Sequence, residues 1–195
     1  MDFIIKKEHL NERNEYVGEI DVSNLDGNLI ADGNLGYIKF KSINVSGFIL
    51  FKAGSGINAG WGIKAGLGIE AGSGIKAGLG IEAGLGIEAG SGIKAGLGIK
   101  AGSGINAGLG IEAGWGIEAG SGIKAGDGIK AGSGINAGLG IEAGLSISAQ
   151  TITTPLRIFA GLCLWRNPSE EEMKVMAKRI DGGGVIAFGE FEKIE

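Results

Sequence analysis

The chain repeats one pattern of apolar and polar positions through most of its length. Isoleucine recurs at every sixth position from Ile57 to Ile147, and alanine follows each isoleucine after one intervening residue. This spacing places Ile and Ala on one face of a β-strand and the Lys, Glu or Asn between them on the other. A Gly-x-Gly segment completes each unit, as in GIKAGLGIEAGLG at residues 74–86. We expect short strands joined by corners, where glycine supplies backbone freedom that includes positive φ.

Six-residue units predict a parallel β-helix, because each unit buries its apolar face only by stacking on its neighbours. Ser55, Ser73 and Ser91 are spaced by 18 residues, and Trp61 and Trp115 by three times 18. A coil of three sides fits these spacings. It also stacks charges of alternating sign, which is favourable between neighbouring strands: Lys64, Glu82, Lys100 and Glu118. A two-sided coil of 12 residues gives nearly as many opposite-charge neighbours, so both coil lengths stay open.

The sequence divides into three parts. Residues 1–51 form a non-repetitive head, in which YIKFKSINVSGFILF (residues 37–51) alternates as a strand does and predicts a β-rich N-terminal cap. Residues 52–149 are the repeat. Residues 150–195 form a tail that we expect to be a C-terminal cap. Caps are needed because an open solenoid end would template further β-pairing.

The tail predicts a strand-helix-strand unit. LRIFAGLCLW (156–165) and VIAFGEFEKI (185–194) indicate strands, and NPSEEEMKVMAKRID (167–181) between them indicates a helix. Ser169 and Glu172 have the spacing of a capping box at the start of this helix. Its buried face would contain Met173, Met176, Ala177 and Ile180. Cys163 would lie in the first strand as a buried, unreactive thiol.

Composition narrows the class of protein. The 41 glycines do not fall at every third position and only two prolines are present, which excludes collagen. A formal net charge of -4, from 18 basic and 22 acidic residues, gives no footprint for direct nucleic-acid binding. The single cysteine fits a reducing compartment. No secretory signal or apolar stretch long enough to span a membrane is evident, so we expect a soluble, cytoplasmic protein.

The unit LGIEAG resembles the repeat of the hexapeptide-repeat β-helix proteins, in which three hexapeptides close one triangular coil. The resemblance covers about half of the chain and implies a left-handed, all-β solenoid. That family has a small residue four positions after the aliphatic one, whereas this chain has Ser, Leu, Trp or Asp there. Arrays of the form AGxGI also resemble those of uncharacterised phage and bacterial proteins.

The best-known enzymes of the hexapeptide-repeat family are acyltransferases, which use a histidine as general base in a cleft between coils. This chain has one histidine, His9, which lies outside the repeats in the charged segment KKEHLNERNE and is expected to be solvated. We therefore predict no catalytic residue, and we expect neither a metal site nor a cofactor.

The direction of the side chain between the two glycines determines whether the corners of the solenoid are apolar. On the simpler interpretation it points inward beside isoleucine. If it points outward, Trp61, Leu67, Leu79, Leu97 and Trp115 form apolar ridges of the kind that mark interfaces. Asp127 belongs to the same series and is hard to bury, which keeps the outward direction open. The candidate binding residues are Trp61, Trp115, Asp127, Trp165 and Arg166.

The leading functional hypothesis is a non-catalytic structural or interaction protein that presents a rigid β-helix surface to a protein partner and also forms a homo-oligomer. A narrower alternative is a phage-type inhibitor of a bacterial defence complex, similar in role to an anti-CRISPR protein. An atypical hexapeptide-repeat acyltransferase is the alternative in the enzyme class. A bound acyl donor, or an activity lost when His9 is changed, would favour that enzyme.

Overall fold

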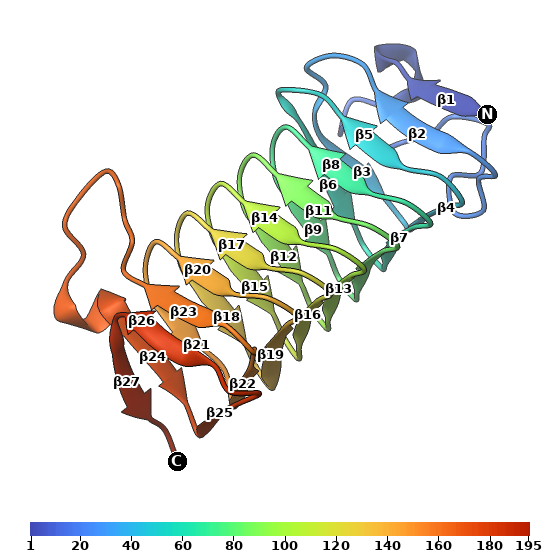
Figure 1. The fold of residues 1–195 in the computed structure, drawn as a ribbon. Coiled ribbons are helices and arrows are strands. Elements are labelled where there is room, and N and C mark those ends of the chain that lie inside the picture. Colours follow the sequence, from blue (N-terminus) through green and yellow to red (C-terminus); the bar gives the residue numbers. More distant parts are fainter.

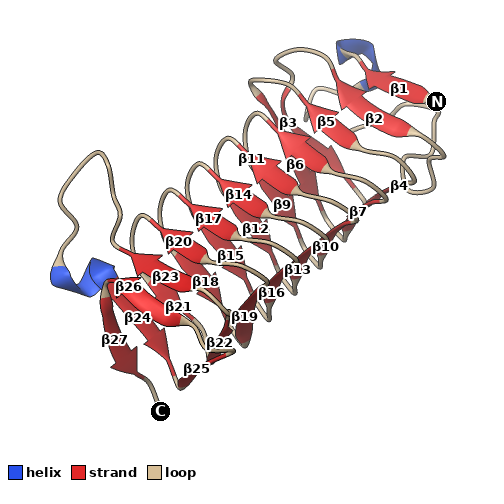
Figure 2. Ribbon diagram, in the orientation of Figure 1, coloured by secondary structure: helices blue, strands red, loops and turns tan.

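The computed structural model describes all residues from Met1 to Glu195 and shows a rod of parallel strands wound into about nine coils. Three long sheets run along the rod and meet at three corners (Figures 1 and 2). Ile81 pairs with Ile63 on one side and Ile99 on the other, so neighbouring coils are 18 residues apart. The three-sided coil is confirmed, and the 12-residue coil is excluded.

We number the sheets I to III. Sheet I contains ten strands: β1 (Asp2–Ile5), β2 (Asn28–Ala31), β5 (Ile49–Phe51), β8 (Ile69–Ala71), β11 (Ile87–Ala89), β14 (Ile105–Ala107), β17 (Ile123–Ala125), β20 (Ile141–Ala143), β23 (Arg157–Ala160) and β26 (Val185–Phe188). Sheet II contains eight: β4 (Ile43–Val45), β7 (Ile63–Ala65), β10 (Ile81–Ala83), β13 (Ile99–Ala101), β16 (Ile117–Ala119), β19 (Gly134–Ala137), β22 (Thr151–Thr153) and β25 (Arg179–Asp181).

Sheet III contains nine strands: β3 (Gly36–Phe40), β6 (Ser55–Ala59), β9 (Ile75–Ala77), β12 (Ile93–Ala95), β15 (Ile111–Ala113), β18 (Ile129–Ala131), β21 (Ile147–Ser148), β24 (Lys174–Ala177) and β27 (Glu190–Lys193). The only helical segments are two 3₁₀ turns, η1 (Lys7–His9) and η2 (Glu170–Met173). Neither turn approaches the length or the apolar character of a membrane-spanning helix.

The core is a single column of stacked side chains. The repeat isoleucines and alanines are almost completely buried, and each stacks on the same residue type in the next coil. Head and tail continue the column with other residues, for example Phe51 below Ala71 and Val175 beyond Ile147. The three sheets therefore run without interruption through the positions 51 and 149 at which the sequence changes character.

The glycines of the repeat are needed for space, and the expectation of positive φ is wrong for them. None of the glycines from Gly56 to Gly144 has φ in the left-handed region. A Cβ on Gly78 would lie 2.0 Å from the carbonyl oxygen of Gly60, one coil earlier. The same contact recurs at the first glycine of nearly every unit. A Cβ on the second glycine of the unit would have more space. At Gly80 the nearest atom, the carbonyl oxygen of Gly98, would be 3.5 Å away.

The variable corner residues point outward, so the simpler inward interpretation is wrong. Trp61, Leu67, Leu79 and Trp115 are all exposed. The Ile and Ala side chains from the three sides already fill the coil interior, which leaves no volume for a third large side chain on each side. Successive corner residues are joined through their backbones, as in the hydrogen bond from the Leu79 N–H to the Trp61 carbonyl. Ser55 at the first corner is the exception, because its side chain is buried and its hydroxyl donates to the carbonyl of Gly33.

The tail is correctly expected to be β-structure at both ends, but the helix between them is wrong. Only the turn η2 is helical, and the residues after it form β24 and β25. Val175 and Ala177 are fully buried with a spacing of two, because they occupy the Ile and Ala positions of the next coil on sheet III. Pairing with β21 thus overrides the local helical pattern.

Candidate binding surfaces

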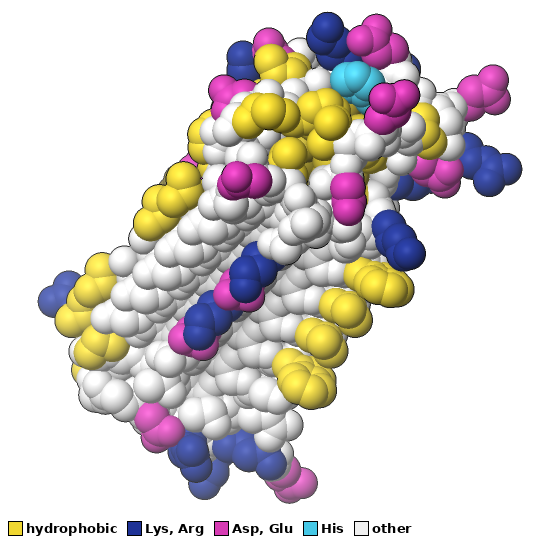
Figure 3. Space-filling model, turned by 90° about the vertical axis from the view of Figure 1, so that its right-hand side faces the viewer, with side chains coloured by type: hydrophobic (Ala, Val, Ile, Leu, Met, Phe, Trp, Pro, Cys, Tyr) yellow, Lys and Arg dark blue, Asp and Glu magenta, His cyan; other side chains and the backbone are white.

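The corner between sheets III and II forms the first candidate surface. Four of its residues stack in consecutive coils and make what we call the tryptophan ridge: Trp61, Leu79, Leu97 and Trp115. The indoles are the most open members, with exposed fractions of 58% for Trp61 and 66% for Trp115. Lys41 lies over the ring of Trp61 at 5.2 Å from its centroid, in a cation–π contact. Figure 3 shows this apolar line along one side of the rod.

A line of alternating charges runs beside the ridge on the outer side of sheet II. This charge row consists of Lys64, Glu82, Lys100 and Glu118. The Lys64 and Glu82 side chains approach to 3.4 Å, and those of Lys100 and Glu118 to 3.2 Å. The alternation expected from an 18-residue coil is confirmed. Because all four side chains are about half exposed, the pairs remain available to solvent or to a partner.

A groove separates the ridge from the charge row, as Figure 3 also shows. Its floor is the column of glycines that precede the isoleucines of sheet II, where the absence of side chains leaves the backbone open. The groove has a volume of about 840 Å³. The tryptophan ridge lines this groove and does not line the corresponding groove over sheet III, so ridge and charge row face the same side.

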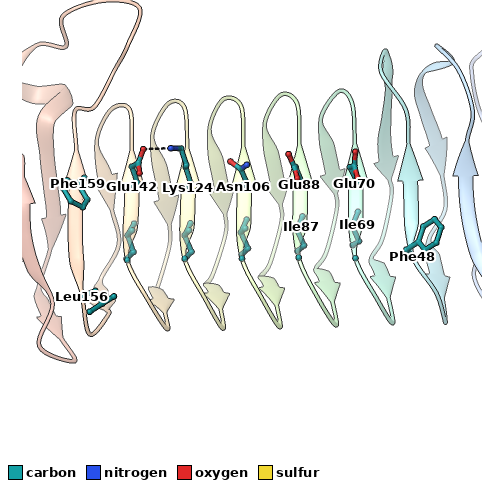
Figure 4. A pocket seen from close by; sticks show the side chains of 18 of the residues that line it. Phe48, Ile69, Glu70, Ile87, Glu88, Asn106, Lys124, Glu142, Leu156 and Phe159 are labelled. Atoms are coloured by element: carbon teal, nitrogen blue, oxygen red, sulfur yellow. Dashed lines mark ion pairs between the residues drawn. The ribbon is translucent and has the colours of Figure 1, made fainter.

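A second groove of about 850 Å³ runs along sheet I (Figure 4). Phe48 lies at one end, and Leu156 and Phe159 lie at the other. The outer row of this sheet is less regular. Its outward-facing residues in the repeats are, in order, Glu70, Glu88, Asn106, Lys124 and Glu142. Glu70 and Glu88 are direct neighbours with like charge, and only the last two of the five form an ion pair. That pair, at 2.7 Å, joins Lys124 and Glu142.

The third candidate surface is a loop inserted at the corner between sheets I and III. This corner loop, residues 161–173, connects β23 to β24 and projects from the rod near its C-terminal end (Figure 1). Gly161 begins it with a φ of +89°, and its N–H donates to the carbonyl of Leu145. Leu164 is 94% exposed and Trp165 is 58% exposed. Cys163, expected in a strand, lies in this loop and is half-buried.

Three of the five sequence-predicted binding residues meet at the corner loop. The Trp165 ring lies against the backbone of the corner at Gly126, where an added Cβ would be 3.4 Å from Cη2. The next residue, Asp127, is half-buried, and its negative charge acts on Arg166. The pKa of Arg166 is raised first by its hydrogen bonds to Glu172, with a smaller contribution from Asp127. Trp61 and Trp115 belong instead to the tryptophan ridge, so the five residues form two separate groups.

The corner loop is held by a charged anchor. Arg166 donates to both carboxylate oxygens of Glu172, at 2.7 and 2.5 Å, and the Ser169 N–H donates to the same carboxylate at 2.9 Å. The Ser169–Glu172 contact expected from the sequence is therefore present, although it caps a single 3₁₀ turn. These hydrogen bonds, those from Arg166 foremost, lower the pKa of the Glu172 carboxyl to about 2.

Sequence reasoning missed Leu164 and Glu172 as parts of this site. The sequence pattern predicts a strand at Leu164 and a helix at Glu172, whereas Leu164 lies outside any strand and Glu172 lies in the single 3₁₀ turn η2. The available signal was the Val-x-Ala spacing at residues 175–177, which repeats the Ile-x-Ala spacing and identifies the next coil. With β24 placed in this way, the segment before it is longer than any other corner and must form a loop.

His9 lies at the other end of the rod from the corner loop (Figure 1). Its Nδ1 accepts a hydrogen bond from the Lys6 N–H at 3.0 Å, and its ring lies 5.4 Å from that of Phe3. The side chain is half-buried rather than fully solvated as expected, because it closes the turn η1. No three His, Cys, Asp or Glu side chains gather as they would around a metal ion.

Comparison with known proteins found no match: no family model, no curated protein and no solved structure is significantly similar to this chain.

Proposed function

We propose that this protein is a non-catalytic interaction protein, whose solenoid holds the corner loop as the contact surface for another protein. The observation that carries this proposal is the exposure of two large apolar side chains, Leu164 and Trp165, in the corner loop. Adjacent exposed apolar side chains are typical of interaction sites. Function also concentrates on loops that a rigid scaffold positions.

Contacts within the chain hold the loop at its start, centre and end, which favours affinity because less conformational entropy is then lost on binding. The Arg166–Glu172 pair fixes its centre. Lys174 fixes its end through contacts of 2.6 Å with Glu171 and 2.7 Å with Glu192. The coil below fixes its start through the Leu162 N–H, which donates to the carbonyl of Ala143.

The composition of the loop indicates the chemistry of the partner. Trp and Arg are the residue types that most often dominate the binding energy of protein interfaces. Here Trp165 is packed on one side against the Gly126 backbone and is open on the other. Glu170 adds an exposed negative charge to the same loop. We expect a partner with an apolar pocket for Leu164 and Trp165 that is bordered by basic residues.

A pull-down from bacterial lysate tests this function. The tagged protein is compared with Leu164→Ser/Trp165→Ser and with the matched control Leu85→Ser/Leu139→Ser, which removes two leucines of about 50% exposure at the corner between sheets II and I. Nuclease treatment removes complexes bridged by nucleic acid, and mass spectrometry identifies what remains. We expect one stoichiometric protein that the control retains and the corner-loop variant loses.

Recovery of the bait alone, or equal loss in both variants, would contradict this function. The identity of the partner separates the narrower hypotheses. A component of a bacterial defence complex would make the protein an inhibitor of that complex. A bound acyl donor, together with an activity abolished by His9→Ala, would point to the acyltransferase instead.

A further inference from the structure

We propose that the face of sheet II is the contact surface of an antiparallel homodimer, with its two-fold axis between β10 and β13. This inference is independent of the corner loop, which lies at a different corner. It depends on the order of residues in the charge row and in the tryptophan ridge.

The charge row is complementary to its own reverse. Along the rod its signs run plus, minus, plus, minus, so a second copy in the opposite direction presents minus, plus, minus, plus. With the axis between β10 and β13, Lys64 lies opposite Glu118 of the second copy. Glu82 lies opposite Lys100 of the second copy. Every charge of the row then meets an opposite charge.

The tryptophan ridge has the same centre of symmetry. In the same reversal Trp61 lies opposite Trp115 of the second copy, and Leu79 lies opposite Leu97. One axis therefore pairs tryptophan with tryptophan, leucine with leucine and lysine with glutamate. The strands beyond the charge row continue the match, because Asn44 of β4 lies opposite Asn136 of β19.

The charges also select the direction of pairing. A parallel dimer would place every residue of the row opposite its own copy, so that Lys64 would face Lys64 and Glu82 would face Glu82. Like charges in direct opposition are unfavourable. In the antiparallel arrangement both partners use the same patch, as a closed two-fold interface requires. Facing sheets pack about 10 Å apart, a separation that Lys and Glu side chains from both sides can span.

The other two faces lack this property. On sheet I an axis through the middle of the outer row would place Glu70 opposite Glu142. On sheet III the corresponding axis would place Lys76 opposite Lys130. Self-complementarity therefore distinguishes sheet II, the face that also has the apolar ridge, and this coincidence favours a second copy over an unrelated partner.

Sedimentation velocity on the 195-residue chain tests the dimer with two matched charge exchanges. Lys64→Glu/Glu118→Lys leaves an opposite charge facing every charge of the row in the second copy. Within the chain, it breaks both ion pairs of the charge row. Lys100→Glu/Glu118→Lys keeps two opposite-charge neighbours within the chain but makes all four oppositions between copies repulsive. The two variants have the same composition and net charge.

We expect the wild-type protein and Lys64→Glu/Glu118→Lys to be dimers. Lys100→Glu/Glu118→Lys should raise the dissociation constant at least about tenfold, because like charges replace opposite charges at four positions. Trp61→Ser/Trp115→Ser should also weaken the dimer. The corner-loop variant Leu164→Ser/Trp165→Ser should leave it unchanged, which separates a failure of this proposal from a failure of the proposed function.

A wild-type protein that stays monomeric at high concentration would overturn the proposal. So would an oligomer that both charge exchanges leave equally stable, because its interface would then lie elsewhere. Circular dichroism of each variant verifies that the solenoid is folded. If the Lys100→Glu/Glu118→Lys variant is unfolded, the Trp61→Ser/Trp115→Ser variant decides between the outcomes.

Discussion

Sheets I and II are the same structure on the inside and two different surfaces on the outside. Both bury Ile and Ala in identical registers, and both have a groove over a column of glycines. Outside, sheet II has a strictly alternating charge row beside an apolar ridge. Sheet I has neighbouring glutamates and a groove that ends in aromatic side chains.

The difference shows that the repeat places few demands on its outward positions. A parallel sheet tolerates any half-exposed polar residue there, because the fold is stabilised by the buried column and by the backbone hydrogen bonds between coils. The fold therefore does not require the ordered pattern of sheet II, and the proposed dimer accounts for it. The interior is uniform because stacking gives every coil the same environment.

The largest effect that we predict tests whether the two interiors are equivalent. Ile99→Ala on sheet II and Ile105→Ala on sheet I each remove a side chain that is 1% exposed. Both variants should lose about 3 kcal/mol of stability, because each leaves a cavity in a packed core. Urea denaturation measures the loss. A loss in one variant that is less than about half of the loss in the other would show that the two sheets are not energetically alike.

A smaller effect distinguishes the two glycines at the corner between these sheets. A Cβ on Gly102 would lie 2.0 Å from the carbonyl oxygen of Gly84, whereas one on Gly104 would lie 3.3 Å from that of Gly122. Gly102→Ala should therefore cost about 2–3 kcal/mol through overpacking against backbone, and Gly104→Ala less than about 1 kcal/mol. Thermal melting compares the two. Equal costs would contradict the spatial explanation of the repeat glycines.

A still smaller effect tests the charge interactions between outward-facing residues on sheets I and III. Glu88→Lys removes the like-charge contact with Glu70 on sheet I and should stabilise the fold by about 0.5 kcal/mol. The same substitution at Glu112 on sheet III breaks its 2.8 Å pair with Lys94 and should destabilise by a similar amount. Sheet II is avoided because its charges also enter the proposed dimer. Both effects should shrink at high salt, and a gain that persists there would be non-electrostatic.

The smallest effect on overall stability concerns the anchor of the corner loop. The folded-state pKa of Glu172 is lowered from 4.5 to about 2 by its hydrogen bonds from Arg166 and Ser169. A lowered pKa means that the anchor is fully present above pH 4.5 and is lost as the pH falls toward 2. In a Trp61→Phe/Trp115→Phe background, Trp165 fluorescence should change over this range while the solenoid stays folded.

Glu172→Gln in the same background is the control for this titration. The glutamine side chain does not ionise, so the fluorescence change attributed to the anchor should be absent from this variant. An identical acid transition in both proteins would show that another group, and not the Arg166–Glu172 pair, controls the environment of Trp165.

Much of the fold is predictable because its signals are local and periodic. The spacing of two between Ile and Ala identifies the strands and their buried face, and the recurrence after 18 residues agrees with the coil length. The tail helix could not be excluded in this way. Its Met and Ile residues also have helical spacing, and only the open edge of β21 decides that Val175 stacks on Ile147 as a strand.

The candidate sites were predictable as residues and not as arrangements. Large apolar side chains at glycine corners already indicated Trp61 and Trp115. Their joint position on one ridge depends on the number of sides per coil. The meeting of Trp165 and Arg166 with Asp127 depends on a loop that folds back over earlier coils, and no local pattern contains that contact.

The sequence by itself determined the interior of this protein, because a period of two within a period of six leaves one way to bury Ile and Ala. Tertiary structure decided between the two coil lengths that the sequence left open, because closing the coil after three sides brings positions 18 apart into contact and so sets which residues share a surface. It also decided that the corner residues face outward, since the stacked Ile and Ala side chains leave them no room inside.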